Sequence, residues 1–583
     1  MTDIDVHGER ADRSPAPLPR SGGRVLVDGL RGHGVTRVFC VPGESYLDVL
    51  DALHDTPEID VVVAKHEGAA ANMAEADGKL TGLPGICLVT RGPGATHATV
   101  GVHTARQDST PMILFIGQVA RGCRDREGFQ EVAFPEMFAP LAKWSAQIDD
   151  AARIPEYLAR AFQVATSGRM GPVVLSLPED VLAETVVSAD VPGFRPVAGA
   201  PRVADIAALD AALRSARRPL VVVGGSGWTE DARARLAGFA ERYDLPVAAS
   251  FRRQDVLDNR SEHYVGHLSL GIDPRLAAGV EEADLILAFG PRLGEVSSGG
   301  YRLVASPRPR QKLVHVHPDP DELGRVYQPD VGIPSSMPSL AEALDRLGPA
   351  AAPPWGDWRA ALRRDYLEFS RPPARHPDHQ GVHLATVVDQ LATALPEDAV
   401  VTNGAGNYTV WVHRFYRYRG LRTELAPTSG AMGYGLPAAI AAKLRHPGRT
   451  VVCFAGDGCF LMYPQELGTA LQSGAAIIVL VVNNGMYGTI RMHQERRFPG
   501  RVVGTDIDAP DFVGLARSFG AYAERVDRSE DFADAFARAQ AAGRPAVLEL
   551  RVDPAQITPT ARLSAVDTQR IGARESRVAV RAS

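Results

Sequence analysis

Residues 451–484 read VVCFAGDGCFLMYPQELGTALQSGAAIIVLVVNN. Two continuous apolar runs, Val451–Phe454 and Ile477–Val482, stand on either side of a stretch long enough for one helix. Apolar strands connected through a helix are typical of a parallel sheet that is covered on both faces. We therefore expect the polar residues after the two runs, Gly456-Asp457-Gly458 and Asn483-Asn484, to meet at the carboxyl edge of one sheet.

The same alternation of an apolar run, a Gly or Pro break and an Ala-rich amphipathic stretch begins near residue 21 and continues along the chain. Two stretches rich in Pro, Ala and charge, 186–202 and 349–380, interrupt it and are typical of linkers. The sequence therefore predicts an α/β protein with three doubly wound parallel-sheet domains. The expected domains are residues 21–185, 203–348 and 381–555, with tails at 1–20 and 556–583.

The composition is that of a globular protein that acts on small molecules. Hydrophobic residues make up 45% and charged residues 23% of the chain, which excludes disordered and collagen-like classes. A net charge of −6 offers no basic field for nucleic acid or anionic lipid. The five cysteines form no CxxC pair, and neither a signal-peptide core nor a membrane-spanning run is present. We expect a cytoplasmic protein.

Asp457 and Asn484 are candidate metal ligands. Carboxylate and amide oxygens at the ends of neighbouring strands suit Mg²⁺, which keeps positions for phosphate oxygens and water. Their spacing of 27 positions leaves room for one helix and one strand. Gly456 and Gly458 let the backbone approach an anion closely. The alternative is a surface GDG turn and an unrelated Asn pair.

This spacing is similar to the thiamine diphosphate (ThDP) motif, in which GDG is followed at this distance by NN. The resemblance implies that Asp457, the Asn484 side chain and the Met486 backbone carbonyl bind Mg²⁺. It also implies that residues beside them, Gly456, Gly458 and Asn483, hold the diphosphate.

Glu67 lies at a strand-to-helix junction in VVVAKHEGAAANMAEADGKLTG, residues 61–82. By itself it is either a charge at a helix start or a buried functional acid. The ThDP resemblance favours the acid, because the glutamate of this motif binds the aminopyrimidine ring. That contact drives the tautomer whose imino nitrogen takes the proton from the thiazolium C2 carbon, which makes Glu67 the first candidate for general acid–base catalysis.

Residues 428–435, TSGAMGYG, contain a methionine in a Gly-rich turn. Such a methionine is often only a gap-filler. The resemblance implies instead that Met432 is a wedge that bends the cofactor into a V, with the Gly430 carbonyl accepting a hydrogen bond from the amino group.

The chain resembles the acetolactate synthase family over roughly residues 24–555. The segments that carry this resemblance are VFCVPGESYLDVLDAL (38–53), LVTRGPGATHATVG (88–101), GFQEV (128–132) and SGRMGPVVLSLPEDV (167–181). The resemblance implies a pyrimidine-binding, a central nucleotide-binding-like and a diphosphate-binding domain, assembled as a homodimer or homotetramer. It places Phe129 and Gln130 in the reaction pocket, where an amide beside an apolar ring can steady an enolate-like species, although FQE alone is a common tripeptide.

Three positions depart from the biosynthetic acetolactate synthases. Glu179 stands where that family carries a Lys, and Val296 stands where it carries an Arg that binds the acceptor's carboxylate. His493 stands where it carries the Trp that selects 2-oxobutyrate, and is either a proton donor or a bystander. A charge-assisted bond to a carboxylate contributes about 1.5 to 3 kcal/mol, so pyruvate as the acceptor is in question.

Three functions follow as hypotheses. The first is a ThDP- and Mg²⁺-dependent 2-oxo acid decarboxylase and carboligase with a pyruvate-type donor. The second is a lyase that cleaves a 2-hydroxy ketone or a 2-hydroxyacyl-CoA, and the third is a catalytically silent regulatory subunit. In the central domain, the Gly-rich turn VVVGGSGW (221–228) is compatible with FAD, ADP or no nucleotide.

Overall fold

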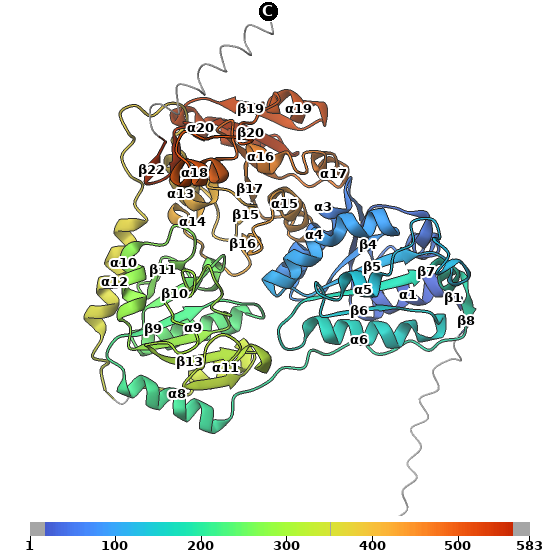
Figure 1. The fold of residues 1–583 in the computed structure, drawn as a ribbon, viewed down its shortest axis with the longest axis horizontal. Helices are drawn as coiled ribbons and strands as arrows, with labels where there is room; N and C mark the ends of the chain where they lie inside the picture. Colours follow the sequence, from blue (N-terminus) through green and yellow to red (C-terminus); the bar gives the residue numbers. More distant parts are fainter. Residues whose placement is uncertain (1–17, 350, 564–583) are drawn as a thin grey trace, which may run out of the picture.

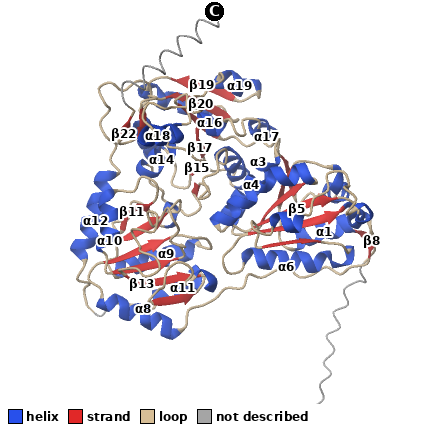
Figure 2. Ribbon diagram, in the orientation of Figure 1, coloured by secondary structure: helices blue, strands red, loops and turns tan. Residues whose placement is uncertain are grey.

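The computed structural model describes residues 18–349 and 351–563. It contains three six-stranded sheets, one in each third of the chain, and every strand pair within them is parallel. Helices cover both faces of each sheet (Figure 2). The predicted α/β class with three doubly wound sheets is confirmed.

The N-terminal sheet has the strand order β3-β2-β4-β5-β7-β6. Its strands are β2 (Arg37–Cys40), β3 (Asp60–Val63), β4 (Gly85–Val89), β5 (Met112–Gln118), β6 (Trp144–Gln147) and β7 (Pro172–Pro178). Its helices are α1 (Gly22–Gly32), α2 (Leu47–His54), α3 (Glu67–Thr81), α4 (Gly92–Asp108), α5 (Phe134–Phe138), α6 (Ile154–Thr166) and α7 (Glu179–Ala183), and a short pair, β1 (Arg20–Ser21) and β8 (Thr185–Val186), closes the unit.

The central sheet has the order β11-β10-β9-β12-β13-β14. Its strands are β9 (Pro219–Val223), β10 (Val247–Ser250), β11 (Tyr264–Leu268), β12 (Leu285–Phe289), β13 (Lys312–His317) and β14 (Val331–Pro334). Its helices are α8 (Val203–Ser215), α9 (Glu230–Arg242), α10 (Pro274–Glu282), α11 (Met337–Asp345) and α12 (Gly356–Phe369).

The C-terminal sheet has the order β16-β15-β17-β18-β20-β19, which repeats the N-terminal pattern. Its strands are β15 (Val400–Asn403), β16 (Glu424–Leu425), β17 (Val451–Gly456), β18 (Ile478–Asn483), β19 (Tyr522–Val526) and β20 (Ala546–Arg551). Its helices are α13 (Leu384–Ala394), α14 (Tyr408–Phe415), α15 (Gly435–Arg445), α16 (Asp457–Phe460), α17 (Glu466–Gln472), α18 (Gly488–Arg497), α19 (Phe512–Ser518) and α20 (Phe532–Ala541). In all three sheets the connections reverse direction beside the first strand, so each has a crevice where parallel sheets bind ligands.

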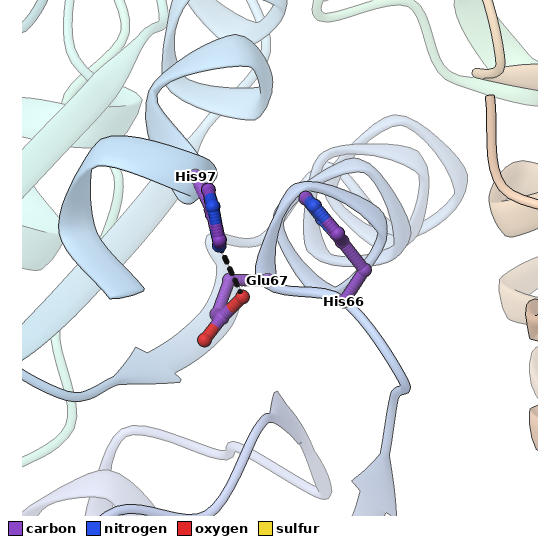
Figure 3. A group of neighbouring side chains, drawn as sticks. All are labelled: His66, Glu67 and His97. Atoms are coloured by element: carbon purple, nitrogen blue, oxygen red, sulfur yellow. Dashed lines mark hydrogen bonds and ion pairs between the residues drawn. The ribbon is translucent and has the colours of Figure 1, made fainter. Parts of the chain in front are cut away.

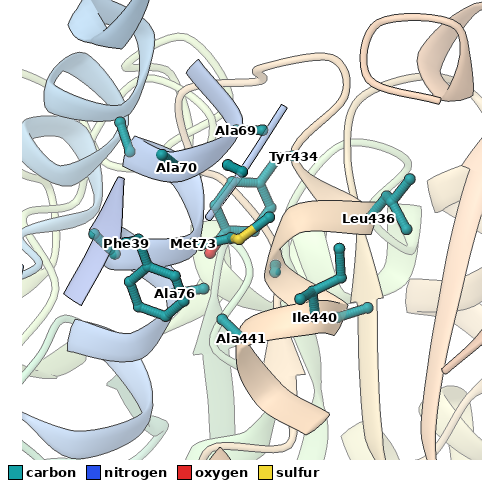
Figure 4. Close-up of a cluster of buried hydrophobic side chains, with 14 of the residues drawn as sticks. Phe39, Ala69, Ala70, Met73, Ala76, Tyr434, Leu436, Ile440 and Ala441 are labelled. Carbon is teal, nitrogen blue, oxygen red and sulfur yellow. The ribbon is translucent and has the colours of Figure 1, made fainter. Parts of the chain in front are cut away.

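Helices α3 and α15 join the N-terminal and C-terminal units within one chain (Figures 1 and 4). The small side chains of α3 allow α15 to approach closely, and Met73 packs beside Tyr434 and Ile440. The buried Tyr434 hydroxyl donates to Glu75 Oε2 at 2.6 Å, and Lys79 pairs with the same carboxylate at 3.1 Å. The two outer units are therefore held in a fixed relation by a buried apolar and polar contact.

Two segments expected outside the domains contain regular structure. Helix α12 lies within the stretch read as the second linker, because Trp358, Leu362 and Tyr366 form an apolar stripe that packs on the central unit. Residues 556–563, at the start of the expected C-terminal tail, include the hairpin strands β21 (Gln556–Thr558) and β22 (Ala561–Arg562). The remaining parts of the expected tails, 1–17 and 564–583, lie outside the described residues.

All five cysteines are free thiols, and only Cys123 is exposed. Within residues 18–349 and 351–563, no helix has the length and apolar character needed to cross a bilayer.

Candidate active site

A cavity of about 260 Å³ opens at the crevice of the C-terminal sheet, between the carboxyl ends of β15, β17 and β18. It combines residues from four chain segments. These are 405–408, Gly430 with Met432, 456–459, and Val482 together with Asn484 and 486–490. The sequence therefore brings its GDG and NN segments to one cavity because β17 and β18 are neighbours in the sheet.

Asp457 lies in the cavity wall with only 3% of its surface exposed. Its Oδ1 accepts from the Gly458 N–H and its Oδ2 from the Gly485 N–H, both at 2.8 Å. No cationic side chain among the described residues pairs with it, so burial raises the pKa of Asp457 to about 6 against the pull of the backbone N–H groups. A buried carboxylate without a counter-charge is the environment that a divalent cation satisfies.

Asn484 and Met486 line the same cavity as Asp457. Asn483 points elsewhere: its Nδ2 donates to Glu549 Oε1 at 2.7 Å and its Oδ1 accepts from the Gly485 N–H at 3.1 Å. Asn483 therefore shapes the turn rather than the cavity surface. Helices α14 and α18 both begin at the cavity, and the positive ends of their dipoles favour an anionic group there.

Met432 and Gly430 also line the cavity, from the loop before α15. Gly430 has φ +69°, a conformation that favours glycine. Arg252 of the central unit holds this loop, because its guanidinium donates to the Pro427 carbonyl and, at 2.9 Å, to the Gly404 carbonyl. Sequence reasoning missed this anchor, since nothing in FRRQD indicates which carbonyls it reaches.

Glu67 is the first residue of α3 and does not line the cavity. Its side chain is 14% exposed, and its Oε2 lies 2.9 Å from His97 Nδ1 on α4 (Figure 3). The turn before it is anchored by the C-terminal unit, where the Glu466 carboxylate accepts from the Lys65 N–H at 3.1 Å. One chain thus holds Glu67 rigidly, at the carboxyl edge of the N-terminal sheet.

Phe129 and Gln130 lie at the same edge as Glu67. The Gln130 carbonyl accepts from the Gly92 N–H at 3.0 Å, at the start of α4. A Cβ on Gly94, two residues along, would lie 3.6 Å from Glu67 Oε1, so α4 brings the two segments together. Phe129 is 71% exposed, although it is a large apolar side chain.

Glu179 is not a free carboxylate in the structure. It lies 2.5 Å from the buried Arg91, whose other nitrogen lies 3.5 Å from Glu44. Glu44 follows β2 and Arg91 follows β4, the two strands that flank the crevice of the N-terminal sheet. Position 179 therefore supplies the anion of an ion pair, where the acetolactate synthase family carries a lysine. The cation of this pair is Arg91.

Val296 and His493 lie apart from these residues. Val296 lines a second cavity, of about 330 Å³, at the crevice between β9 and β12 of the central sheet. That cavity is bounded by Thr428, which belongs to the loop that carries Met432. His493 is exposed on α18 and does not line the 260 Å³ cavity. The structure therefore does not bring Glu179, Val296 and His493 into one pocket within a single chain.

Family models for thiamine pyrophosphate (TPP) enzymes match the chain in three places. TPP is another name for ThDP. The N-terminal TPP-binding domain matches residues 20–137, the central domain 206–344, and the C-terminal TPP-binding domain 404–550. The chain belongs to the thiamine pyrophosphate enzymes. Each match falls on a different sheet, with the N-terminal match ending before β6 and the C-terminal match beginning directly after β15. The match at 404–550 includes the cavity with Asp457.

Relatives of this thiamine pyrophosphate enzyme are acetolactate synthases. The chain is 33% identical over 553 residues to the acetolactate synthase large subunit of Parasynechococcus marenigrum, covering 92% of this chain and 88% of the relative. It is 31% identical to the large subunit of Corynebacterium glutamicum, covering 94% and 89%, and 30% identical to the Bacillus subtilis acetolactate synthase, covering 91% and 93%. The resemblance drawn from the motifs is confirmed, and the chain is a ThDP-dependent enzyme of this family.

Proposed function

We propose that this enzyme is a Mg²⁺-dependent 2-oxo acid decarboxylase and carboligase with a pyruvate-type donor. The observation that carries the proposal is the buried Asp457 carboxylate, which has no cationic partner among the described residues and lies in a cavity with Asn484 and Met486. The similarity to acetolactate synthases over more than nine-tenths of the chain supports the reaction class.

The residues of the cavity fit a metal-bound diphosphate. Asp457, the Asn484 side chain and the Met486 carbonyl would hold Mg²⁺, which prefers oxygen ligands and keeps positions for phosphate oxygens. Glycine is required at Gly458, where a Cβ would lie 2.5 Å from the Tyr487 ring. ThDP supplies a carbon centre that stabilises negative charge after loss of carbon dioxide. The protein's part is to hold it with Gly430 and Met432 and to manage the proton at Glu67.

We further propose that a complete site forms between two copies of the chain. The cavity is lined only by residues 405–490, whereas Glu67, Phe129 and Gln130 lie at the edge of another sheet. Phe129 is 71% exposed at this edge, so its ring is accessible to a second chain. The minimal unit is therefore a homodimer, and a tetramer is two such pairs.

The acceptor is the open part of the reaction. The Arg91 guanidinium is already paired with Glu179 and Glu44, so the group carries a net negative charge and does not attract a second carboxylate. This favours an acceptor other than pyruvate. A lyase that cleaves a 2-hydroxy ketone or a 2-hydroxyacyl-CoA is therefore the second candidate function.

The central cavity of about 330 Å³ is the proposed place for a nucleotide, either FAD or ADP. It lies at a sheet crevice and is lined by Arg253 and Arg292, which suit a phosphate. The absorbance spectrum of the purified protein tests for flavin. A cytoplasmic location also stays a proposal, supported by five free thiols.

The test is turnover of pyruvate by the purified protein with ThDP and Mg²⁺, with acetolactate and carbon dioxide assayed together. Release of carbon dioxide supports the donor, and acetolactate in equal measure names pyruvate as the acceptor as well. Release of neither from pyruvate or other small 2-oxo acids contradicts the proposal and favours the lyase.

A further inference from the structure

Two stacked histidines, His66 and His97, lie beside the carboxyl group of Glu67. His97 Nδ1 lies 2.9 Å from Glu67 Oε2, and the His97 ring stacks on His66 with centroids 4.6 Å apart and an interplanar angle of 29°. The Tyr463 ring, from the loop between α16 and α17, lies 5.2 Å from His66. Figure 3 shows His97 on α4 pointing directly at the carboxyl group of Glu67.

His66, Glu67 and His97 form the one group of potential metal ligands found among the described residues. Their ligand atoms lie within 4.8 Å of one another. The hydrogen bonds oppose a metal there. His66 Nδ1 accepts the Gly68 N–H at 3.0 Å, so the neutral ring carries its proton on Nε2 and has no lone pair to donate from that side. Burial, with a contribution from His97, lowers the pKa of His66, which keeps this ring neutral. His66 is thus a helix cap for α3.

His97 has a different role from His66. Glu67 Oε1 has no hydrogen-bond partner among residues 18–349 and 351–563, and it lies over the start of α4 close to Gly94. His97 therefore occupies one carboxyl oxygen and leaves the other open. A carboxyl that must bind a ring nitrogen at one oxygen gains from having the other fixed, because a free side chain loses rotamer entropy when it binds.

We infer that His97 is a positioning residue for Glu67. The His97 ring holds Glu67 Oε2 and so leaves Glu67 Oε1 available to the cofactor's pyrimidine nitrogen. One proton lies in the contact: either the imidazole N–H donates to the carboxylate, or the protonated carboxyl donates to the ring. In both arrangements the carboxyl keeps a single rotamer. The inference rests on the proposed role of Glu67 and gives a role to a residue outside the segment 61–82 that contains Glu67.

The test uses substitutions at His97 in the full-length holoenzyme. In His97→Asn the amide Nδ2 is the same number of bonds from Cα as the imidazole Nδ1, so a donor is retained. His97→Leu removes the donor. His103→Leu is the matched control, because His103 is also exposed on α4 and makes no hydrogen bond to any described residue. The His97 side chain is 53% exposed, so these variants are expected to fold.

Two quantities are measured for each variant. The first is the dissociation constant for ThDP with Mg²⁺ by calorimetry, and the second is the rate at which the C2–H of bound ThDP exchanges for deuterium. We expect His97→Leu to weaken binding about fivefold and to slow the exchange about tenfold, the range for the loss of one ordinary intramolecular hydrogen bond. His97→Asn and His103→Leu are expected to stay within about twofold of the wild type.

The outcomes separate the two claims. If wild type exchanges C2–H no faster than free ThDP, the proposed function fails and takes the inference with it. If wild type is fast, Glu67→Gln is slow and His97→Leu equals wild type, the inference alone is overturned. Equal losses in His97→Leu and His97→Asn also overturn it, because a retained donor should rescue the contact. Loss in Leu with rescue by Asn supports it.

Discussion

Replacing Asp457 by Asn removes from the apo enzyme a loss of stability that grows with pH. In the apo protein, burial raises the pKa of Asp457 from 3.8 to about 6. Because the folded-state pKa is the higher one, stability is full below pH 4 and is lost as pH rises through 6. Relative to its value at low pH, the free energy of unfolding is then lower by about 3 kcal/mol at pH 8 and by about 1.6 kcal/mol at pH 5. Between pH 5 and pH 8 the free energy of unfolding of the wild type should fall by roughly 1.4 kcal/mol, and that of Asp457→Asn should not.

The amide also has a constant cost. Asn accepts only one of the two backbone bonds now made by Asp457, from Gly458 and Gly485, and the unsatisfied N–H costs about 1 to 3 kcal/mol at every pH. The test is therefore the pH dependence of hydrogen exchange at the amides of β17, which reports the free energy of opening that sheet. The assay uses chelated protein, with the exposed Asp508→Asn as control. An identical pH slope in wild type and Asp457→Asn would refute the reasoning.

Three further predictions follow from the same contacts. Glu67→Gln should lower carbon dioxide release about 10²- to 10⁴-fold, the usual contribution of a general acid–base group, with the melting temperature unchanged; full turnover would contradict the role of Glu67. Mixing inactive Glu67→Gln and Asp457→Asn chains, followed by subunit exchange, should restore about a quarter of wild-type activity, because half of the dimers are mixed and each has one intact site; no recovery after verified exchange would place the site within one chain. Tyr434→Phe should destabilise the junction of α3 and α15 by about 1 to 3 kcal/mol in urea unfolding, because the buried Glu75 loses a donor at 2.6 Å; an unchanged midpoint would show that the bond adds nothing.

The fold and part of the site could be predicted because their signals are local. The runs Val451–Phe454 and Ile477–Val482 are apolar throughout, and this marks buried parallel strands. Neighbouring parallel strands end at one edge, so Asp457 and Asn484 had to come close together, and they line one cavity. Their roles as ligands remain predictions.

The contacts that the sequence did not reveal depend on how elements pack. His97 reaches Glu67 across 30 residues, through the packing of α4 against α3, where a Cβ on Gly101 would lie 2.4 Å from Ala71. Arg91 pairs with Glu179 from the end of another strand. No periodicity within one segment encodes such distances, so neither partner could be assigned from sequence.

The surroundings of Val296 also depend on how elements pack. In the single chain Val296 lines the central cavity, because the loop after β12 turns toward the crevice beside β9, and its place in a substrate pocket stays a prediction. The ThDP resemblance implies that Asn483, the neighbour of Asn484, holds the diphosphate. Strand alternation points its side chain to the opposite face, where it bonds to Glu549.

The central claim is that the cavity with Asp457 holds ThDP through a divalent cation. Calorimetric titration of the purified enzyme with ThDP tests it most directly, in Mg²⁺ and again in excess chelator. The account predicts one ThDP per chain in Mg²⁺, and binding weakened about 10- to 100-fold both by the chelator and by Asp457→Asn, as expected when a charge-assisted contact is lost. Tight binding that survives both the chelator and the substitution would contradict it.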